Sequence, residues 1–99
     1  MFDKIMQAQA MAGEVKRRLD SVTVTGSVEG GKITVTSNAN KVVQSIAIDP
    51  EFLKEADKDE LEELLVIAFN KAMEQADNVS QSEMAASAKE MFGNLGGLF

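Results

Sequence analysis

The chain has 99 residues, of which 44% are hydrophobic, and a formal net charge of −6 at pH 7. This composition is typical of one folded domain and indicates that the chain as a whole is not a disordered segment. His and Cys are absent, which removes the usual acid–base group near neutral pH, the most reactive nucleophile and any disulfide framework. We therefore expect no enzymatic activity.

No apolar run approaches the ~18 residues of a membrane-spanning helix. The segment Met1–Ile5 also lacks the basic and apolar regions of a secretory signal. We expect a cytoplasmic protein that has no contact with membranes.

Residues 2–19 are predicted to form an amphipathic helix. Apolar residues recur there at steps of three and four, which places them on one stripe: Phe2, Ile5, Ala8, Ala12, Val15 and Leu19.

Three alternating segments predict an antiparallel meander of strands over residues 21–28, 33–37 and 42–48. Gly30-Gly31 separates the first two and predicts a two-residue hairpin turn, because both positions accept positive φ. The alternation predicts that Ile33 and Val35 point inward, and that the third strand has one apolar face: Val42, Ile46 and Ile48.

Asp49-Pro50 predicts the start of a short helix, with Asp49 as its N-cap. A long helix follows over residues 58–91, ~50 Å long at ~1.5 Å per residue. One compact domain of this size cannot cover such a helix, so a second chain is expected. We predict one domain over residues 1–92 and a flexible Gly-rich tail over residues 93–99.

The first half of the long helix is apolar around most of its circumference, which predicts burial on more than one side. One side would pack on the sheet and the other on a partner chain. The candidate dimer-interface residues are Leu61, Leu64, Leu65, Ile67, Phe69 and Met73.

The only basic cluster is Lys16-Arg17-Arg18, near the end of the first helix. Two interpretations remain open for it: stabilisation of the helix dipole, or contact with phosphate groups. The acidic run over residues 55–63 lacks calcium-loop spacing and indicates a solvated helix start, so no metal site is expected. A strand follows Gly30-Gly31, which indicates a turn and not a phosphate-binding loop.

The order of these features resembles the YbaB/EbfC family of bacterial nucleoid-associated proteins. The resemblance spans nearly the whole chain. It is carried by the segment Gly30 to Thr36, the corner Ile46-Ala47-Ile48-Asp49-Pro50, and the helical segments Leu61-Glu62-Glu63-Leu64 and Ala68-Phe69-Asn70-Lys71-Ala72.

The resemblance implies an α+β fold with an N-terminal helix, a three-stranded antiparallel meander and a long C-terminal helix, assembled as a tweezer-like homodimer. It implies a role at the nucleoid in binding double-stranded DNA with little sequence preference, and no enzymatic activity, cofactor or small-molecule substrate. The helical arms would contact DNA, so the candidate phosphate-binding residues are Lys4, Lys16, Arg17, Arg18 and Lys89.

The alternative is a protein-interaction module of the same fold. Residues 51–99 carry four Lys against eleven Asp and Glu, a net charge of −7. Acidic arms of this kind would repel DNA and would suit a basic protein partner.

Overall fold

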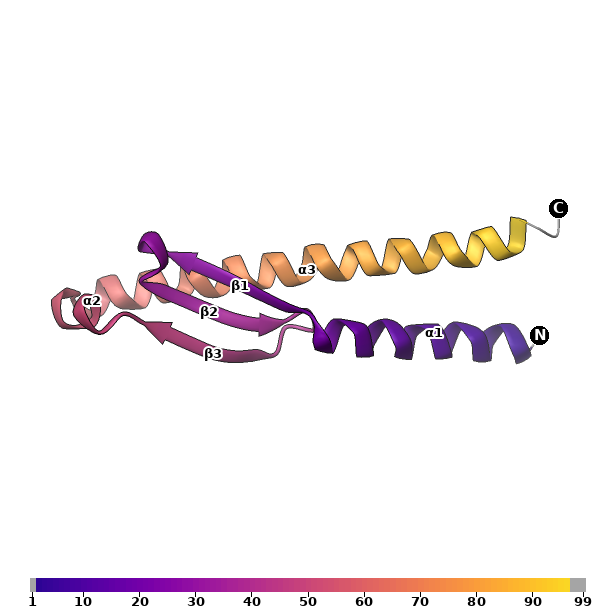
Figure 1. The fold of residues 1–99 in the computed structure, drawn as a ribbon, viewed down its shortest axis with the longest axis horizontal. Coiled ribbons are helices and arrows are strands. Elements are labelled where there is room, and N and C mark those ends of the chain that lie inside the picture. The colour runs from indigo at the N-terminus through magenta and orange to yellow at the C-terminus, as the bar shows by residue number, and fades with distance from the viewer. Residues whose placement is uncertain (1, 97–99) are drawn as a thin grey trace.

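The computed structural model describes residues 2–96, and its elements follow the predicted order (Figure 1). The helices and strands are α1 (Phe2–Ser21), β1 (Thr23–Val28), a 3₁₀ turn (Glu29–Gly31), β2 (Ile33–Asn38), β3 (Val43–Ile48), α2 (Pro50–Glu55) and α3 (Lys58–Gly96). The predicted fold class, a helix followed by an antiparallel meander and a long helix, is confirmed.

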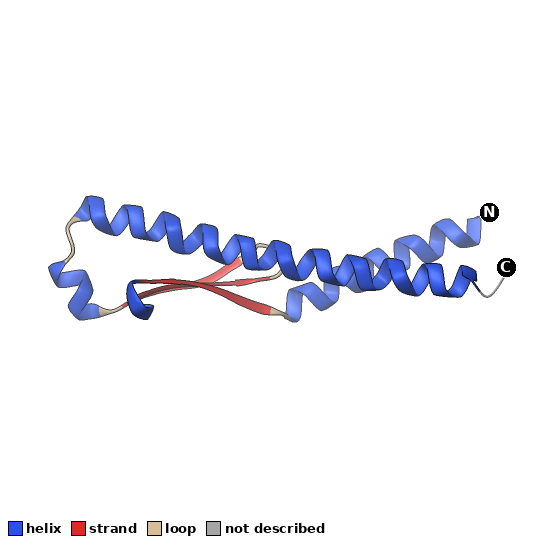
Figure 2. Cartoon of the chain, turned by 90° about the horizontal axis from the view of Figure 1, so that it is seen from above, coloured by secondary structure: helices blue, strands red, loops and turns tan. Residues whose placement is uncertain are grey.

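The molecule is a rod that measures 64 × 20 × 18 Å. Its radius of gyration is 18.9 Å, whereas a compact domain of about 100 residues has one of about 13 Å. The sheet lies along the first half of α3, and α1 runs beside the second half in the opposite direction, so that both termini lie at one end (Figures 1 and 2). We call this paired end of α1 and α3 the arm.

The long helix α3 extends past the predicted end at Met91 and reaches Gly96. The predicted tail over residues 93–99 therefore begins inside this helix, and residues 97–99 lie outside the described part of the chain. Although α3 is long, none of the described helices is apolar enough over a sufficient length to cross a membrane.

The loop between β1 and β2 is longer than predicted. Val28 pairs with Ile33, so four residues form the connection and not two. Glu29, Gly30 and Gly31 have φ values of 51°, 64° and 91°. The positive φ expected at both glycines is confirmed, but Glu29 shares the left-handed conformation, and Lys32 completes the loop with a hydrogen bond from its N–H to the Glu29 carbonyl oxygen.

A bulge changes the predicted face of β3. Thr36 pairs with Ser45, but Ser37 pairs with Val43, so Gln44 is the extra residue. Val43, and not Val42, therefore shares the inner face of the sheet with Ile46 and Ile48, because paired residues of neighbouring strands point to the same side.

Ile33 and Val35 are fully buried beneath α3, as predicted. The helix approaches the sheet closely because it presents only small side chains there, Ala68, Ala72 and Ala76, all fully buried. On the sheet side the contact is Gly26 of β1. A Cβ atom at Gly26 would overlap the carbonyl oxygen of Ala68 and lie 2.5 Å from the backbone nitrogen of Ala72.

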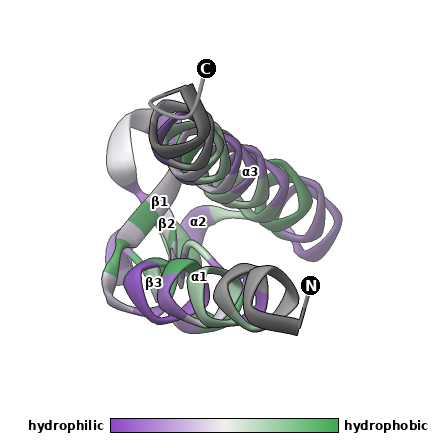
Figure 3. Cartoon of the chain, turned by 90° about the vertical axis from the view of Figure 1, so that its right-hand side faces the viewer, coloured by the Kyte–Doolittle hydropathy of each residue, from purple (hydrophilic) through white to green (hydrophobic). Residues whose placement is uncertain are grey.

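A second, smaller core joins α1 to the rest of the molecule. Val15 and Leu19 of α1 are buried together with Ala39 of the β2–β3 turn, and Val22 and Val79 pack against them. This cluster holds the base of the arm, and Figure 3 shows α1 and α3 beside each other at this end.

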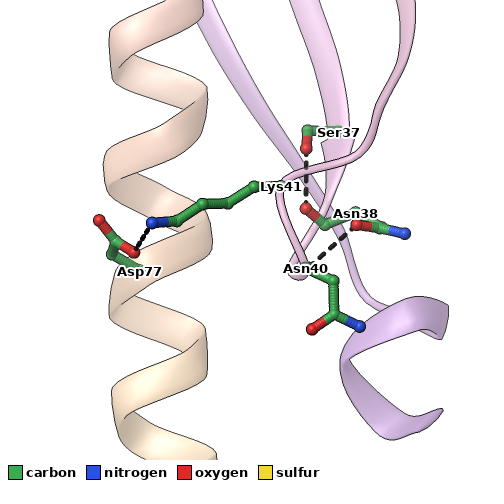
Figure 4. Close-up of polar contacts among 5 residues, drawn as sticks. All are labelled: Ser37, Asn38, Asn40, Lys41 and Asp77. Atoms are coloured by element: carbon green, nitrogen blue, oxygen red, sulfur yellow. Dashed lines mark hydrogen bonds and ion pairs between the residues drawn. The ribbon is translucent and has the colours of Figure 1, made fainter. Parts of the chain in front are cut away.

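The β2–β3 turn is organised by the buried side chain of Asn38 (Figure 4). Its Oδ1 atom accepts hydrogen bonds from the backbone N–H groups of Asn40 (2.9 Å) and Val42 (3.0 Å). Ser37 Oγ donates to the Asn38 carbonyl oxygen at 2.8 Å. With Lys41 at a φ of 66°, these bonds define a single turn conformation.

The corner before α2 also agrees with prediction. Asp49 caps the helix, since its Oδ2 atom accepts a hydrogen bond from the backbone N–H of Phe52 at 3.0 Å. Pro50 occupies the first helical position, and Phe52 is buried in the main core.

We predict that Gly26→Ala destabilises the protein by about 1–3 kcal/mol, because the added methyl group must push α3 away from β1. Chemical denaturation of the parent and the variant measures the effect. Gly13→Ala is the matched control: no atom lies within 4 Å of its added Cβ, and Ala is the better helix former, so this variant should gain up to ~1 kcal/mol. Equal stability of the Gly26→Ala variant and the parent would contradict the close approach.

We predict that Asn38→Ala costs about 1–3 kcal/mol, because two backbone N–H groups of the turn lose their acceptor. Thermal melting followed by circular dichroism measures the loss. Asn78→Ala, at an exposed position of α3, should leave the melting temperature unchanged or slightly raised. A melting temperature for Asn38→Ala that equals that of Asn78→Ala would refute the role given to Asn38.

Candidate functional site

The basic cluster Lys16-Arg17-Arg18 lies in the last turns of α1, where the helix meets the sheet. All three side chains are exposed. The helix ends just beyond them, where Ser21 Oγ donates a hydrogen bond to the Arg18 carbonyl oxygen at 2.8 Å. The predicted placement of the cluster near the end of the first helix is therefore confirmed.

The β2–β3 turn fixes the position of this part of α1. Asn40 Nδ2 donates a hydrogen bond to the Lys16 carbonyl oxygen at 2.8 Å, and also contacts Asp20 Oδ1 at 2.5 Å. The turn that Asn38 organises thus holds the backbone beneath the basic cluster, while the three basic side chains remain exposed.

An open depression of about 410 Å³ lies beside the cluster. It is lined by Glu14, Arg17, Arg18 and Ser21. Two guanidinium groups and a hydroxyl group supply hydrogen-bond donors there, and the Glu14 carboxylate reduces the net positive charge.

Two ion pairs connect this region to α3. Arg18 Nη1 lies 3.8 Å from Glu83 Oε2, and Lys41 Nζ lies 2.5 Å from Asp77 Oδ1 (Figure 4). The base of the arm therefore holds basic and acidic groups in similar number. Its surface is a mixed-charge surface and not a strongly positive one.

The other two candidate DNA-contacting residues lie further along the arm. Lys89 is exposed on α3, six residues beyond Glu83, or ~9 Å along the helix axis. Lys4 belongs to α1, ~21 Å from Arg18 along that axis, and its side chain lies outside the described part of the structure. Among the five candidates only Lys16, Arg17 and Arg18 are neighbours, and Lys4 and Lys89 belong to distant turns of two different helices.

Sequence reasoning missed Lys41, Asp77 and Glu83 as members of this region. Lys41 follows a turn that could be recognised from Asn38-Ala39-Asn40. Its ion pair with Asp77, however, depends on the way α3 passes the sheet. Helical periodicity alone cannot pair residues of α1 or the turn with residues of α3.

The six candidate dimer-interface residues fall into two groups. Leu61, Leu64, Leu65 and Met73 are partly buried against the main core of their own chain. Ile67 and Phe69 are 46% and 42% exposed. These two point to nearly opposite sides of α3, since two helical steps correspond to ~200°.

The side of α3 next to β3 carries uncovered apolar residues. Asp77 of α3 reaches the β2–β3 turn through Lys41, whereas Lys71 donates a hydrogen bond to the Ser27 carbonyl oxygen of β1. Val66 precedes Asp77 by eleven residues, or about three turns, so it lies on the same side of the helix as Asp77, away from β1.

The inner face of β3 is uncovered as well. Ile46 pairs with the fully buried Val35 but is itself 53% exposed, because α3 packs on β1 and β2. Together with the neighbouring side of α3, these residues form what we call the open apolar face: Val43, Ile46, Val66, Phe69 and Met73.

Comparison with known proteins identifies the relatives of this chain. A nucleoid-associated protein of Bordetella avium is 41% identical over 83 residues, which cover 81% of this chain and 76% of that protein. A nucleoid-associated protein of Flavobacterium johnsoniae is 36% identical, with 90% and 82% of the two chains covered. One from Chloroflexus aurantiacus is 36% identical over all 99 residues, which cover 95% of that protein.

A solved structure has the same fold. The crystal structure of an uncharacterised protein from Helicobacter pylori superposes with a TM-score of 0.67 at 17% sequence identity, covering 82% of this chain and 93% of that one. Residues 1–91 of this chain match the YbaB/EbfC DNA-binding family. Together with the sequence relatives, this match shows that the chain belongs to the YbaB/EbfC DNA-binding family.

Proposed function

We propose that this protein is a nucleoid-associated homodimer that binds double-stranded DNA with little sequence preference. The observation that carries the proposal is the exposed cluster Lys16-Arg17-Arg18 at the base of the arm, in a chain whose family is described as DNA-binding. Lys4 and Lys89 would add contacts further along the arm.

The geometry of the cluster favours phosphate groups over base edges. Three successive residues of a helix point in directions ~100° apart, so they cannot all enter one groove. Long Lys and Arg side chains can nevertheless reach phosphates on either side of the helix, and phosphate contacts carry no direct sequence information. Such a cluster positions the protein on DNA without reading its sequence.

The number of contacts limits the affinity. If the three cations of both copies engaged phosphates, roughly six contacts would give a slope of about −5 in a plot of log affinity against log salt. One copy alone would make few contacts and bind weakly. Two copies on one rigid body bind with greater avidity than either alone.

The proposed dimer would cover the open apolar face. Ile46 and Phe69 each remain about half exposed in the single chain, and β3 is an edge strand of the sheet. A second copy would remove this apolar surface from water. We place Phe69 and Met73 at this interface, with Leu61, Leu64 and Leu65 supporting them from the core of their own chain, and leave Ile67 on the opposite side of α3.

The second candidate function is a dimeric interaction module for a basic protein partner, located on the same arm. It is favoured by the carboxylates of the second half of α3, which outnumber its single Lys89: Glu74, Asp77, Glu83 and Glu90. DNA-binding measurements decide between the two functions, because a protein that prefers a basic partner should not bind duplex DNA even at low salt.

We predict that the parent protein is a dimer and that Ile46→Asp makes it monomeric, because the substitution places a carboxylate in the open apolar face. Light scattering at micromolar concentration should give about twice the 10.7 kDa chain mass for the parent and half of that value for the variant. Ser45→Asp is the matched control, since this neighbouring residue points to the other face of the sheet. A parent mass of one chain, or a dimeric Ile46→Asp variant, would refute this interface.

We predict that changing Lys16, Arg17 and Arg18 together to Ala abolishes measurable DNA binding, because the only neighbouring phosphate-binding groups are lost. A mobility-shift titration with duplex DNA at about 50 and 200 mM salt measures this loss, since phosphate contacts weaken steeply over that range. Dimer mass and circular dichroism should be unchanged, because all three side chains are exposed.

The control for that experiment is the double variant of Lys54 and Lys58 to Ala. These lysines lie at the opposite end of the molecule from the arm and pair with Glu51 and Glu62 on their own helices. Their loss should change DNA affinity little. If the parent protein binds no duplex DNA at about 50 mM salt, the DNA-binding function is refuted and the interaction module becomes the better account.

A further inference from the structure

The ion pair between Arg18 and Glu83 joins the basic cluster to the acidic side of α3. Its closest atoms, Arg18 Nη1 and Glu83 Oε2, are 3.8 Å apart. This separation is within ion-pairing range but too long for a hydrogen bond. The side chains are 48% and 30% exposed, so solvent and solutes reach both groups.

A carboxylate and a phosphodiester offer a guanidinium group the same kind of partner. Each presents anionic oxygens to the planar set of N–H donors. Arg18 cannot use the same donors for both at once. A phosphate that takes the edge of the Arg18 guanidinium facing Glu83 therefore displaces the carboxylate, and the free energy of the ion pair opposes that contact.

We propose that Glu83 competes with DNA for Arg18, so that the arm partly neutralises its own phosphate-binding cluster and lowers its affinity for DNA. This inference rests on the proposed DNA-binding function and concerns the same site. It assigns to Glu83 a role in setting affinity, without contact to DNA.

The neighbouring pair between Lys41 and Asp77 has a different character. Lys41 Nζ and Asp77 Oδ1 are 2.5 Å apart, which is hydrogen-bonding distance, and Lys41 belongs to the turn that Asn38 organises. Opening this pair would also remove a polar contact between the turn and α3, beside the packing of Ala39 with Val79. The longer Arg18–Glu83 pair is thus the one that a phosphate would displace more readily.

The size of the effect follows from the exposure of the pair. Loss of one exposed ion pair changes an equilibrium constant, here that of DNA binding, by a factor of roughly 1.4 to 5. If both copies of a dimer bind DNA together, the factor applies twice and becomes roughly 2 to 25. Because both groups are in contact with solvent, the effect should diminish as salt screens the pair.

The test is a mobility-shift comparison of Glu83→Gln with Glu74→Gln at about 50 mM salt. Both variants remove one negative charge from the same helix, but nine residues correspond to ~900°, so Glu74 points to the side opposite Glu83. We expect Glu83→Gln to bind duplex DNA roughly 2 to 25 times more tightly than the parent, and Glu74→Gln to differ from the parent by less than a factor of about 2. Circular dichroism and light scattering establish that the variants remain folded and keep the parent's mass.

The second arm of the test repeats the substitution in an Arg18→Ala background. If Glu83 acts through Arg18, Glu83→Gln should then tighten binding no more than Glu74→Gln does. Tightening that persists without Arg18 would overturn the inference, because it would mark a general charge effect. Equal affinities of the parent and Glu83→Gln would overturn it as well.

The same titrations separate this inference from the proposed function. Binding by the parent without tightening by Glu83→Gln refutes only the competition. Binding by neither protein refutes DNA binding itself and the competition with it.

Discussion

The close contact between Gly26 of β1 and the alanine ridge of α3 is the constraint on which the rest of the structure depends. Ala68, Ala72 and Ala76 are fully buried, and a Cβ atom at Gly26 would overlap the helix backbone. The axis of α3 is therefore held close to β1 and β2. Helix length then carries the second half of α3 beyond the sheet, and α1 packs beside that half to form the arm.

The same placement leaves β3 uncovered. A single helix cannot cover three strands whose neighbours lie ~4.8 Å apart, and the contact at Gly26 pulls α3 toward β1. Ile46 and Phe69 are left half exposed as a consequence. The open apolar face and the tight contact thus lie on the same face of the sheet, at its β3 and β1 edges, and the uncovered edge is the structural reason to propose a second copy.

In the arm, basic side chains are neutralised by ion pairs with individual carboxylates of α3. Arg18 and Lys41 each face a carboxylate of α3, so the net charge of a sequence segment is a poor guide to what a ligand would meet. Residues 1–20 carry a net charge of +1 and residues 51–99 one of −7. Folding places only the second half of α3 beside α1, so the affinity for a polyanion depends on how readily individual ion pairs open there.

The sequence alone determined the order of elements, the cap at Asp49, the inward positions of Ile33 and Val35, and the position of Lys16-Arg17-Arg18 near the end of the first helix. Local rules decide these features, because helical and strand periodicity, capping and turn chemistry act between residues close in sequence. Only the tertiary structure decided the four-residue loop at Glu29–Lys32 and the extension of α3 to Gly96. It also decided the bulge in β3 that places Val43, and not Val42, on the inner face of the sheet. It also decided which carboxylates face Arg18 and Lys41, because those pairs depend on how closely two elements distant in sequence pack against each other.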